Sequence, residues 1–244
     1  MNWLKRMIFP NRCLGCSDIV SQDDHTFCPA CWANIDMIQP PWCNSCGIPL
    51  EFSYTEDASL SLCARCDHTK PFYDYARSAY VYNDASKKGI LALKHQDQTH
   101  YSRTYASILY KMYPNICNEC EVIVPIPLHW KRLMMRQYNQ AGLIAKHLGR
   151  LCNKPVDFDH LKRTVATKSQ GHQGRAERIK NLDNAFIVAG DDAFYQKKIL
   201  VIDDVMTTGA TLNQAAWALR TAKPKQIVCL TIAHALPHGG AKQE

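Results

Sequence analysis

A short stretch of the chain combines groups that hold a phosphate with groups that hold a sugar. Residues 199–211 read Ile-Leu-Val-Ile-Asp-Asp-Val-Met-Thr-Thr-Gly-Ala-Thr. The small-residue turn precedes a segment with helical spacing, so its backbone N–H groups and hydroxyls are offered to an anion at a helix N-terminus. The neighbouring carboxylates of Asp203 and Asp204 can accept hydrogen bonds from a vicinal diol. The pattern therefore indicates a sugar with a phosphate at one end and two hydroxyls at the other.

These residues resemble the signature of type I phosphoribosyltransferases, in which four apolar residues, two acids, two further residues and a Thr/Gly turn follow one another. The resemblance implies that the acid pair binds the ribose hydroxyls of phosphoribosyl pyrophosphate (PRPP). It also implies that the 5-phosphate of PRPP is held by Thr207, Thr208, Gly209, Ala210 and Thr211. An ordinary βα turn with a solvated acid pair is the alternative explanation.

Eight of the twelve cysteines lie before residue 67, in four C-x2-C pairs. The pairs are Cys13/Cys16, Cys28/Cys31, Cys43/Cys46 and Cys63/Cys66. Each pair places two sulfurs on one face of a tight turn, and the spacing suits small ribbons that close on a tetrahedral zinc ion. In a reducing compartment zinc, rather than disulfides, would stabilise a segment with so few large apolar side chains. We therefore predict two zinc sites with four cysteine ligands each, paired in sequence order.

Spacing alone leaves other arrangements of the cysteines open. A cross-braced pairing would join the first C-x2-C pair to the third, and iron–sulfur ligation would give the purified protein a colour. A fifth pair, Cys117 and Cys120, has no second pair to complete a tetrahedron, since only Cys152 and Cys229 remain. Free thiols are the expected state of this fifth pair, with a redox or metal role as the alternative.

Charge divides the 244-residue chain into two parts. Residues 1–70 carry 5 Lys/Arg and 8 Asp/Glu, whereas residues 71–244 carry 24 and 14, so the net charges are −3 and +10. Attraction of a polyanion, whether PRPP or nucleic acid, is expected from the second part. No apolar run approaches the roughly 20 residues that span a bilayer, and the apolar stretch within residues 1–10 is too short for a signal peptide. We expect a cytoplasmic protein with a double zinc ribbon at 1–70 and a second domain at 71–244.

Strands and helices alternate in the second part. Strands are predicted at residues 77–82, 121–127, 184–188, 198–203 and 226–233, and helices at 86–94, 101–112, 141–151 and 212–220. Residues 71–74 are expected to link the two parts. This alternation predicts an α/β fold, a parallel doubly wound sheet with helices on both faces and with ligands at the carboxyl ends of its strands.

Two further stretches could bring basic groups to that edge of the sheet. Residues 124–140 follow a predicted strand and include Arg136, and residues 167–181 form a long polar stretch with Arg175 and Arg178. A connection of that length is typical of a mobile functional loop. Pyrophosphate gains negative charge as it leaves, so positioned guanidinium groups and Mg²⁺ would lower the barrier. We predict that Arg136 and Arg175 bind pyrophosphate and that Arg178 is catalytic; a solvated surface charge is the alternative for each.

The order of several motifs along the chain resembles that of the ComF family of competence-associated proteins and their GntX-like relatives. The shared features are the cysteine-rich segment, Val-Pro-Ile-Pro-Leu, Arg-x-x-Asn-Gln-Ala, Ser-Gln followed by Glu-Arg-x-x-Asn-Leu-x-x-Ala-Phe, and the PRPP motif. The resemblance covers nearly the whole chain. It implies a double zinc ribbon, a type I phosphoribosyltransferase-like domain and a part in the uptake or use of external DNA. Gln137 stands where the family usually has Gly, so the backbone there is less free to approach pyrophosphate.

The first functional hypothesis is a Mg²⁺-dependent phosphoribosyltransferase that acts in natural competence on an unidentified acceptor. In purine-salvage members of the fold, an acid three residues after the acid pair acts on the base. Thr207 stands at that position here. His129 and His172 are candidate bases only, because a lone histidine is more often structural.

The second hypothesis is a non-catalytic protein that binds PRPP, single-stranded DNA and proteins of the competence machinery. The basic second part motivates it, together with the run Trp130-Lys131-Arg132 and the nearby Tyr138. Such interleaving suits base stacking combined with phosphate contact. Under either hypothesis, we expect the zinc ribbon to unfold on strong chelation while the second part keeps its own fold and its PRPP binding.

Overall fold

A four-stranded parallel sheet forms the centre of the computed structural model, which describes residues 12–20, 27–51, 61–95, 99–128, 138–164, 185–190 and 192–236. Its strands, in spatial order, are β1 (Tyr75–Val81), β6 (Gln226–His234), β5 (Lys198–Met206) and β2 (Val122–Pro125). The carboxyl end of β5 pairs with that of β6, since Asp203 lies opposite Thr231 and Met206 opposite His234. This edge of the sheet is where parallel α/β folds place their ligands.

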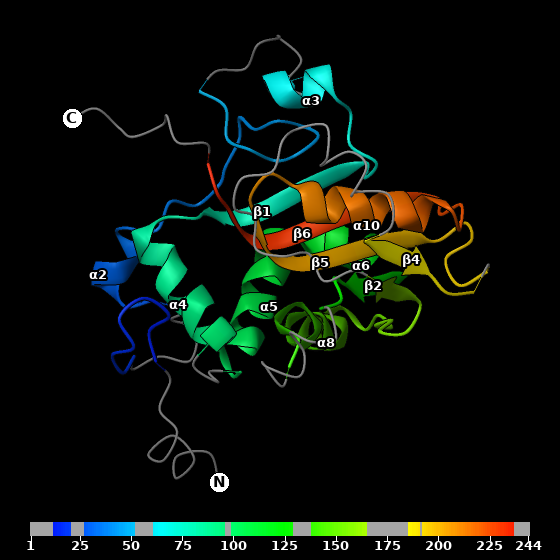
Figure 1. The fold of residues 1–244 in the computed structure, drawn as a ribbon. Coiled ribbons are helices and arrows are strands. Elements are labelled where there is room, and N and C mark those ends of the chain that lie inside the picture. Colours follow the sequence, from blue (N-terminus) through cyan, green and yellow to red (C-terminus); the bar gives the residue numbers. More distant parts are fainter. Residues whose placement is uncertain are drawn as a thin grey trace, which may run out of the picture.

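Helices cover both faces of the sheet (Figure 1). On one face lie α4 (Asp84–His95), α5 (Tyr101–Met112), α6 (Pro114–Glu119) and α8 (Gln140–Cys152), and on the other lies α10 (Ala210–Arg220). Successive residues of β5 pack against opposite faces, Leu200 and Ile202 on the first and Ile199 and Val201 on the second. A strand buried on both faces needs an unbroken apolar run, and this is the run that the sequence contains. The predicted α/β fold with helices on both faces is confirmed.

The two outer strands of the sheet are paired with further chain. Met37, which lies between the two pairs of cysteine knuckles, forms an antiparallel bridge with Tyr80 of β1. Val156, after α8, forms a parallel bridge with Ile123 of β2. Paired edges protect a sheet from adding strands of other molecules. The segment between the cysteine clusters is therefore part of the sheet structure.

The cysteine-rich segment packs on both faces of the sheet. Its first part places Leu14 and Phe27 in the core formed with α4, α5 and α8. Its second part, with Cys46 and Cys66, belongs to the core formed with α10. In Figure 1 the two parts accordingly lie apart, near α4 and around α3 (Ala64–His68). The division into domains at residues 1–70 and 71–244 stays a prediction, although the two segments share apolar cores.

The structure adds detail to the sequence-based expectation, or departs from it, in four places. β5 continues to Met206, so the acid pair lies within the strand and not at its end, because residues 205 and 206 keep pairing with β6. β3 (Leu161–Arg163), which pairs with β4 (Phe186–Val188), was not predicted, and neither was α6. The expected linker at residues 71–74 is bonded to α10, where the Asn213 side chain accepts the Phe72 N–H at 2.7 Å. No helix in the described ranges is long and apolar enough to cross a membrane.

Candidate substrate and metal sites

The acid pair lies on β5 near its carboxyl end, beside a lysine from another element. Asp204 Oδ2 lies 3.0 Å from Nζ of Lys94, which is in the last turn of α4. Their side chains are only 16% and 20% exposed, so this ion pair is partly shielded from water. The Asp204 N–H donates to Oδ1 of Asp203 at 2.9 Å. The two carboxylates are thus held in fixed positions by the strand and by Lys94.

The surroundings of Asp203 raise the pKa of its carboxyl group. Burial, followed by the negative charge of Asp204, raises the pKa of Asp203 to about 7. The Asp204 N–H, Lys94 and Arg163 of β3 act in the opposite direction. Two adjacent carboxylates away from water favour the arrival of a cation or of hydroxyl donors, because these stabilise the charged form. This is the electrostatic setting that a diol-binding acid pair needs.

The turn after β5 leads through a left-handed glycine into the start of α10. Gly209 is the N-cap residue of α10, with φ +72°, and a Cβ there would lie 2.7 Å from the Met206 side chain. Thr207, Thr208 and Ala210 are exposed, and the Thr208 hydroxyl accepts the Ala210 N–H at 3.4 Å. The first N–H groups of a helix have no partner within the helix, so here they face an accessible turn. The required glycine and the exposed helix start are what the sequence predicts for a phosphate turn.

The structure joins some of the predicted site residues and adds two others. The acid pair and the turn lie on one continuous β5–α10 connection. Lys94 and Arg163 are basic residues of this site that the sequence analysis did not identify. Lys94 is the last basic residue of the predicted helix at 86–94, which was a usable signal, whereas Arg163 lies in a strand too short to predict. Several other candidates lie outside the described residues, namely His129, Arg136, His172, Arg175 and Arg178.

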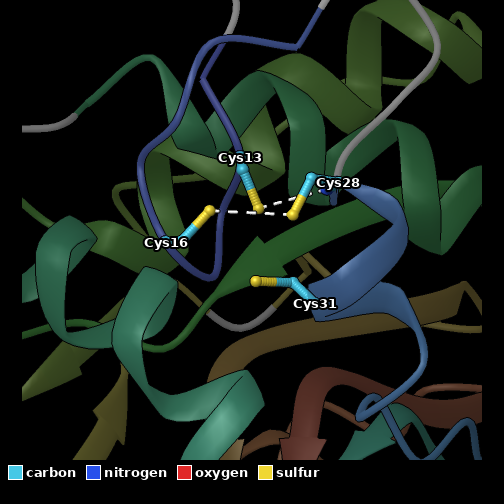
Figure 2. A group of neighbouring side chains, drawn as sticks. All are labelled: Cys13, Cys16, Cys28 and Cys31. Atoms are coloured by element: carbon cyan, nitrogen blue, oxygen red, sulfur yellow. Dashed lines mark hydrogen bonds between the residues drawn. The ribbon is translucent and has the colours of Figure 1, made fainter.

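Four cysteine sulfurs converge at each of two places. Cys13, Cys16, Cys28 and Cys31 form one cluster, shown in Figure 2, and Cys43, Cys46, Cys63 and Cys66 form the other. Within each cluster all sulfurs lie within 4.8 Å of one another, and the sulfurs of Cys16 and Cys28, like those of Cys46 and Cys63, are 3.7 Å apart. Tetrahedral zinc with bonds of about 2.3 Å requires sulfurs about 3.8 Å apart, which fits this spacing. The pairing in sequence order is confirmed, and the cross-braced alternative is wrong.

The knuckle backbone stabilises the thiolate form of one ligand, Cys13. Cys13 Sγ accepts the N–H groups of Gly15 at 3.3 Å and of Cys28 at 3.2 Å. Burial raises the pKa of the Cys13 thiol, but amide hydrogen bonds, including these two, outweigh it and leave the pKa at about 7. Thiolate is the form that binds zinc, so the turn prepares the ligand before the metal arrives.

The fifth cysteine pair differs from the knuckles. Cys117 and Cys120 are buried, and burial raises the pKa of each thiol to about 12. Within the described chain neither belongs to a group of metal-binding side chains. Both are free thiols of the protein core, which is the state expected from their spacing.

Two protein-family models match the chain, one at the cysteine-rich segment and one at the second part. Residues 4–70 match the family model of the double zinc ribbon domain, and residues 141–243 match that of the phosphoribosyl transferase domain. The fold and the two sites thus define a double zinc ribbon joined to a phosphoribosyltransferase-type domain.

Curated relatives match the chain over different shares of its length. The chain is 29% identical to Competence protein F of Haemophilus influenzae, over 93% of this chain and 98% of that protein. It is 27% identical to Competence protein ComFC of Bacillus subtilis, over 85% and 88% respectively. It is also 33% identical to the DNA utilization protein YhgH of Escherichia coli K12, over 44% of this chain and 48% of that protein. The chain is thus similar over most of its length to two competence proteins and over about half of its length to a DNA utilization protein.

The cysteine clusters predict the metal content. We expect two zinc ions per chain, because each cluster supplies four ligands at the spacing of a tetrahedral site. Replacing Cys16 and Cys28 by serine should remove one ion, whereas replacing the buried Cys117 and Cys120 should remove none. Elemental analysis of protein purified without chelator measures both. One zinc or none in the unaltered protein would contradict the double-ribbon assignment.

The raised pKa of Asp203 predicts a stability effect. When folding raises the pKa of a carboxyl group, the folded protein loses stability as the pH rises. The loss begins near pH 4, the pKa of the group in the unfolded chain, and is complete above its pKa in the folded protein. Asp203→Asn keeps the Oδ1 that accepts the Asp204 N–H. We expect this variant to raise Tm at pH 8 by about 3 °C without ligand, since a protein of this size gains roughly 2–4 °C per kcal/mol. Calorimetry at pH 4.5, where the difference should shrink, is the control; an unchanged or lower Tm at pH 8 would refute the prediction.

Proposed function

We propose that the protein binds PRPP together with Mg²⁺ and transfers its phosphoribosyl group to an acceptor during the handling of external DNA. The observation that carries the proposal is the direct succession of acid pair, glycine turn and helix start at the carboxyl edge of the sheet. An anion and a diol can be held there simultaneously. In this proposal the protein works in the cytoplasm with partners from the competence machinery, and its similarity to two competence proteins supports such partners.

Each described group has a part in this binding mode. Asp203 and Asp204 accept the ribose hydroxyls, and residues 207–211 receive the 5-phosphate at the N-terminus of α10. Lys94 and Arg163 place positive charge beside the acid pair, which limits its repulsion of a substrate carrying three phosphate groups. Arriving hydroxyl groups would favour the ionised form of Asp203 and so complete the site.

Chemistry at the sugar requires stabilisation of the leaving pyrophosphate. Carboxylate and phosphate oxygens are the ligands that Mg²⁺ prefers, so the acid pair fits a Mg²⁺–PRPP complex, in which the ion would neutralise phosphate charge. In the proposal Arg136 and Arg175 bind the pyrophosphate and Arg178 stabilises its departure, as the sequence pattern indicates. These three assignments stay predictions.

Binding of PRPP tests the site. Asp204→Asn should weaken PRPP binding by at least about tenfold, since a charged hydrogen bond to a ligand is worth roughly 1.5–3 kcal/mol. Lys94→Met should weaken it by several-fold, because Asp204 would lose its counterion. The matched control is Lys88→Met, which removes an exposed lysine from the same helix. Calorimetric titration with Mg²⁺ present measures all four proteins; equal affinities would contradict the assignment.

Turnover is a separate question from binding. Incubation of the protein with PRPP, Mg²⁺ and a panel of nucleobases and amines, followed by an assay for released pyrophosphate, tests transfer directly. Release that depends on one acceptor and is lost in Asp204→Asn would establish a phosphoribosyltransferase. PRPP binding without release for any acceptor would instead favour the second candidate function.

That second candidate is a non-catalytic factor that binds PRPP and single-stranded DNA. The net charge of +10 on residues 71–244 favours it, since nucleic-acid binding rests on phosphate contacts. It predicts that affinity for an oligonucleotide falls steeply as salt rises from 50 to 200 mM, by roughly ten- to a hundredfold for a few phosphate contacts. Fluorescence anisotropy measures this. Affinity that does not change with salt would rule out the electrostatic mode of binding.

A further inference from the structure

One arginine connects the second zinc ribbon to the phosphate turn. Arg65 lies in the short helix α3, between the metal ligands Cys63 and Cys66. Its Nη1 donates a hydrogen bond to the backbone carbonyl of Thr208 at 2.6 Å, across 143 residues of sequence. The same guanidinium interacts electrostatically with Cys46 and Cys66. Arg65 therefore lies between the metal ligands and the turn that is proposed to hold phosphate.

The chain that follows Cys66, the last zinc ligand, is hydrogen-bonded to α10, the helix that begins after the phosphate turn. The Phe72 N–H donates to Asn213 Oδ1 at 2.7 Å, and Arg220 Nε donates to the Phe72 carbonyl at 2.9 Å. Arg220 also pairs with Asp74 at 2.9 Å. Tyr73 is buried, and its hydroxyl lies 3.6 Å from the position that a Cβ of Gly209 would occupy. The chain between the second ribbon and β1 is thus joined to α10 by several contacts.

The bond to Thr208 has a geometric consequence for the turn. In a trans peptide the C=O and the following N–H point in opposite directions. Because Arg65 holds the Thr208 carbonyl toward the ribbon, the Gly209 N–H is directed to the other side of the turn. The φ of +72° at Gly209 is compatible with this fixed orientation. An N–H group aimed away from the ribbon points to the side of the turn on which the proposed phosphate would bind.

We propose that the second zinc ribbon positions the phosphate turn through Arg65. Zinc at Cys43, Cys46, Cys63 and Cys66 fixes α3, α3 fixes Arg65, and Arg65 fixes the Thr208–Gly209 peptide. Arg65 is a positioning residue, and zinc at this ribbon becomes a requirement for tight binding of the 5-phosphate. This rests on the proposed function, since it assigns the turn to PRPP. It also reverses the expectation from sequence that PRPP binding survives chelation.

Substitutions of Arg65 test the proposal against a matched control. Arg65→Met removes the guanidinium and keeps most of the apolar stem, and Arg65→Lys keeps the charge but not the forked donor. Arg12→Met is the control, because Arg12 is an exposed arginine whose Nη1 bonds a carbonyl of its own ribbon, that of Ser17, at 3.0 Å. Zinc content by elemental analysis establishes that each variant keeps both ions.

The proposal predicts the order of the PRPP affinities of these variants. Calorimetry should show PRPP affinity lowered about fivefold in Arg65→Met and less in Arg65→Lys, with Arg12→Met unchanged. Full affinity in Arg65→Lys together with a loss in Arg65→Met would contradict the geometric argument, since charge alone would then suffice. Equal affinity in all four proteins would overturn the proposal.

A measurement without ligand separates this proposal from the proposed function. Hydrogen exchange read by mass spectrometry should show faster exchange in peptides covering residues 207–212 of Arg65→Met, and no change there in Arg12→Met. If the unaltered protein fails to bind PRPP, the proposed function is wrong, and this exchange result alone decides whether Arg65 orders the turn. Unchanged exchange in Arg65→Met would overturn the positioning role.

Discussion

Two adjacent, half-buried carboxylates at the edge of a sheet are the constraint on which the site depends. Asp203 and Asp204 repel each other, and burial removes the water that would screen them, so the pKa of Asp203 rises to about 7. The fold compensates with Lys94, 3.0 Å from Asp204, and with Arg163. A stable core alone would not retain such a pair, because unsatisfied buried charge destabilises the folded state. Its presence is best explained by a ligand that supplies cations or hydroxyl donors.

The cysteine-rich segment contributes to the packing of the central sheet. Its two parts pack on opposite faces, and the chain between them pairs with β1 through Met37. Zinc replaces the apolar core that so short a segment cannot form. The second part contacts the turn after β5 through the hydrogen bond from Arg65 to the Thr208 carbonyl, and under the proposal above this bond links the ribbon to the phosphate turn. Metal binding and ligand binding are therefore expected to be coupled in this protein.

The sequence predicted those elements whose structure is determined by residues that are neighbours in the chain. The apolar run of β5, the glycine turn and the cysteine knuckles each specify their structure through neighbouring residues. The partnership of Lys94 with Asp204, and of Arg65 with Thr208, could not be predicted, because each joins elements that only the tertiary fold brings together. β3 was missed because three residues, two of them charged, carry no strand periodicity. Zinc pairing was ambiguous in sequence and was resolved only by the positions of the sulfurs.

The most direct test is the number of protons released when PRPP binds. An acid with a pKa of about 7 is half protonated at pH 7, and binding of hydroxyl groups or a metal ion to its ionised form releases that proton. Calorimetry of Mg²⁺–PRPP binding at pH 7, in buffers of different ionisation enthalpy, counts the protons. At a saturating PRPP concentration, we predict that the unaltered protein releases about half a proton more than Asp203→Asn at pH 7, and that the two proteins release equal numbers of protons at pH 9. Equal proton release by the two proteins at pH 7, with equal affinity, would contradict the account.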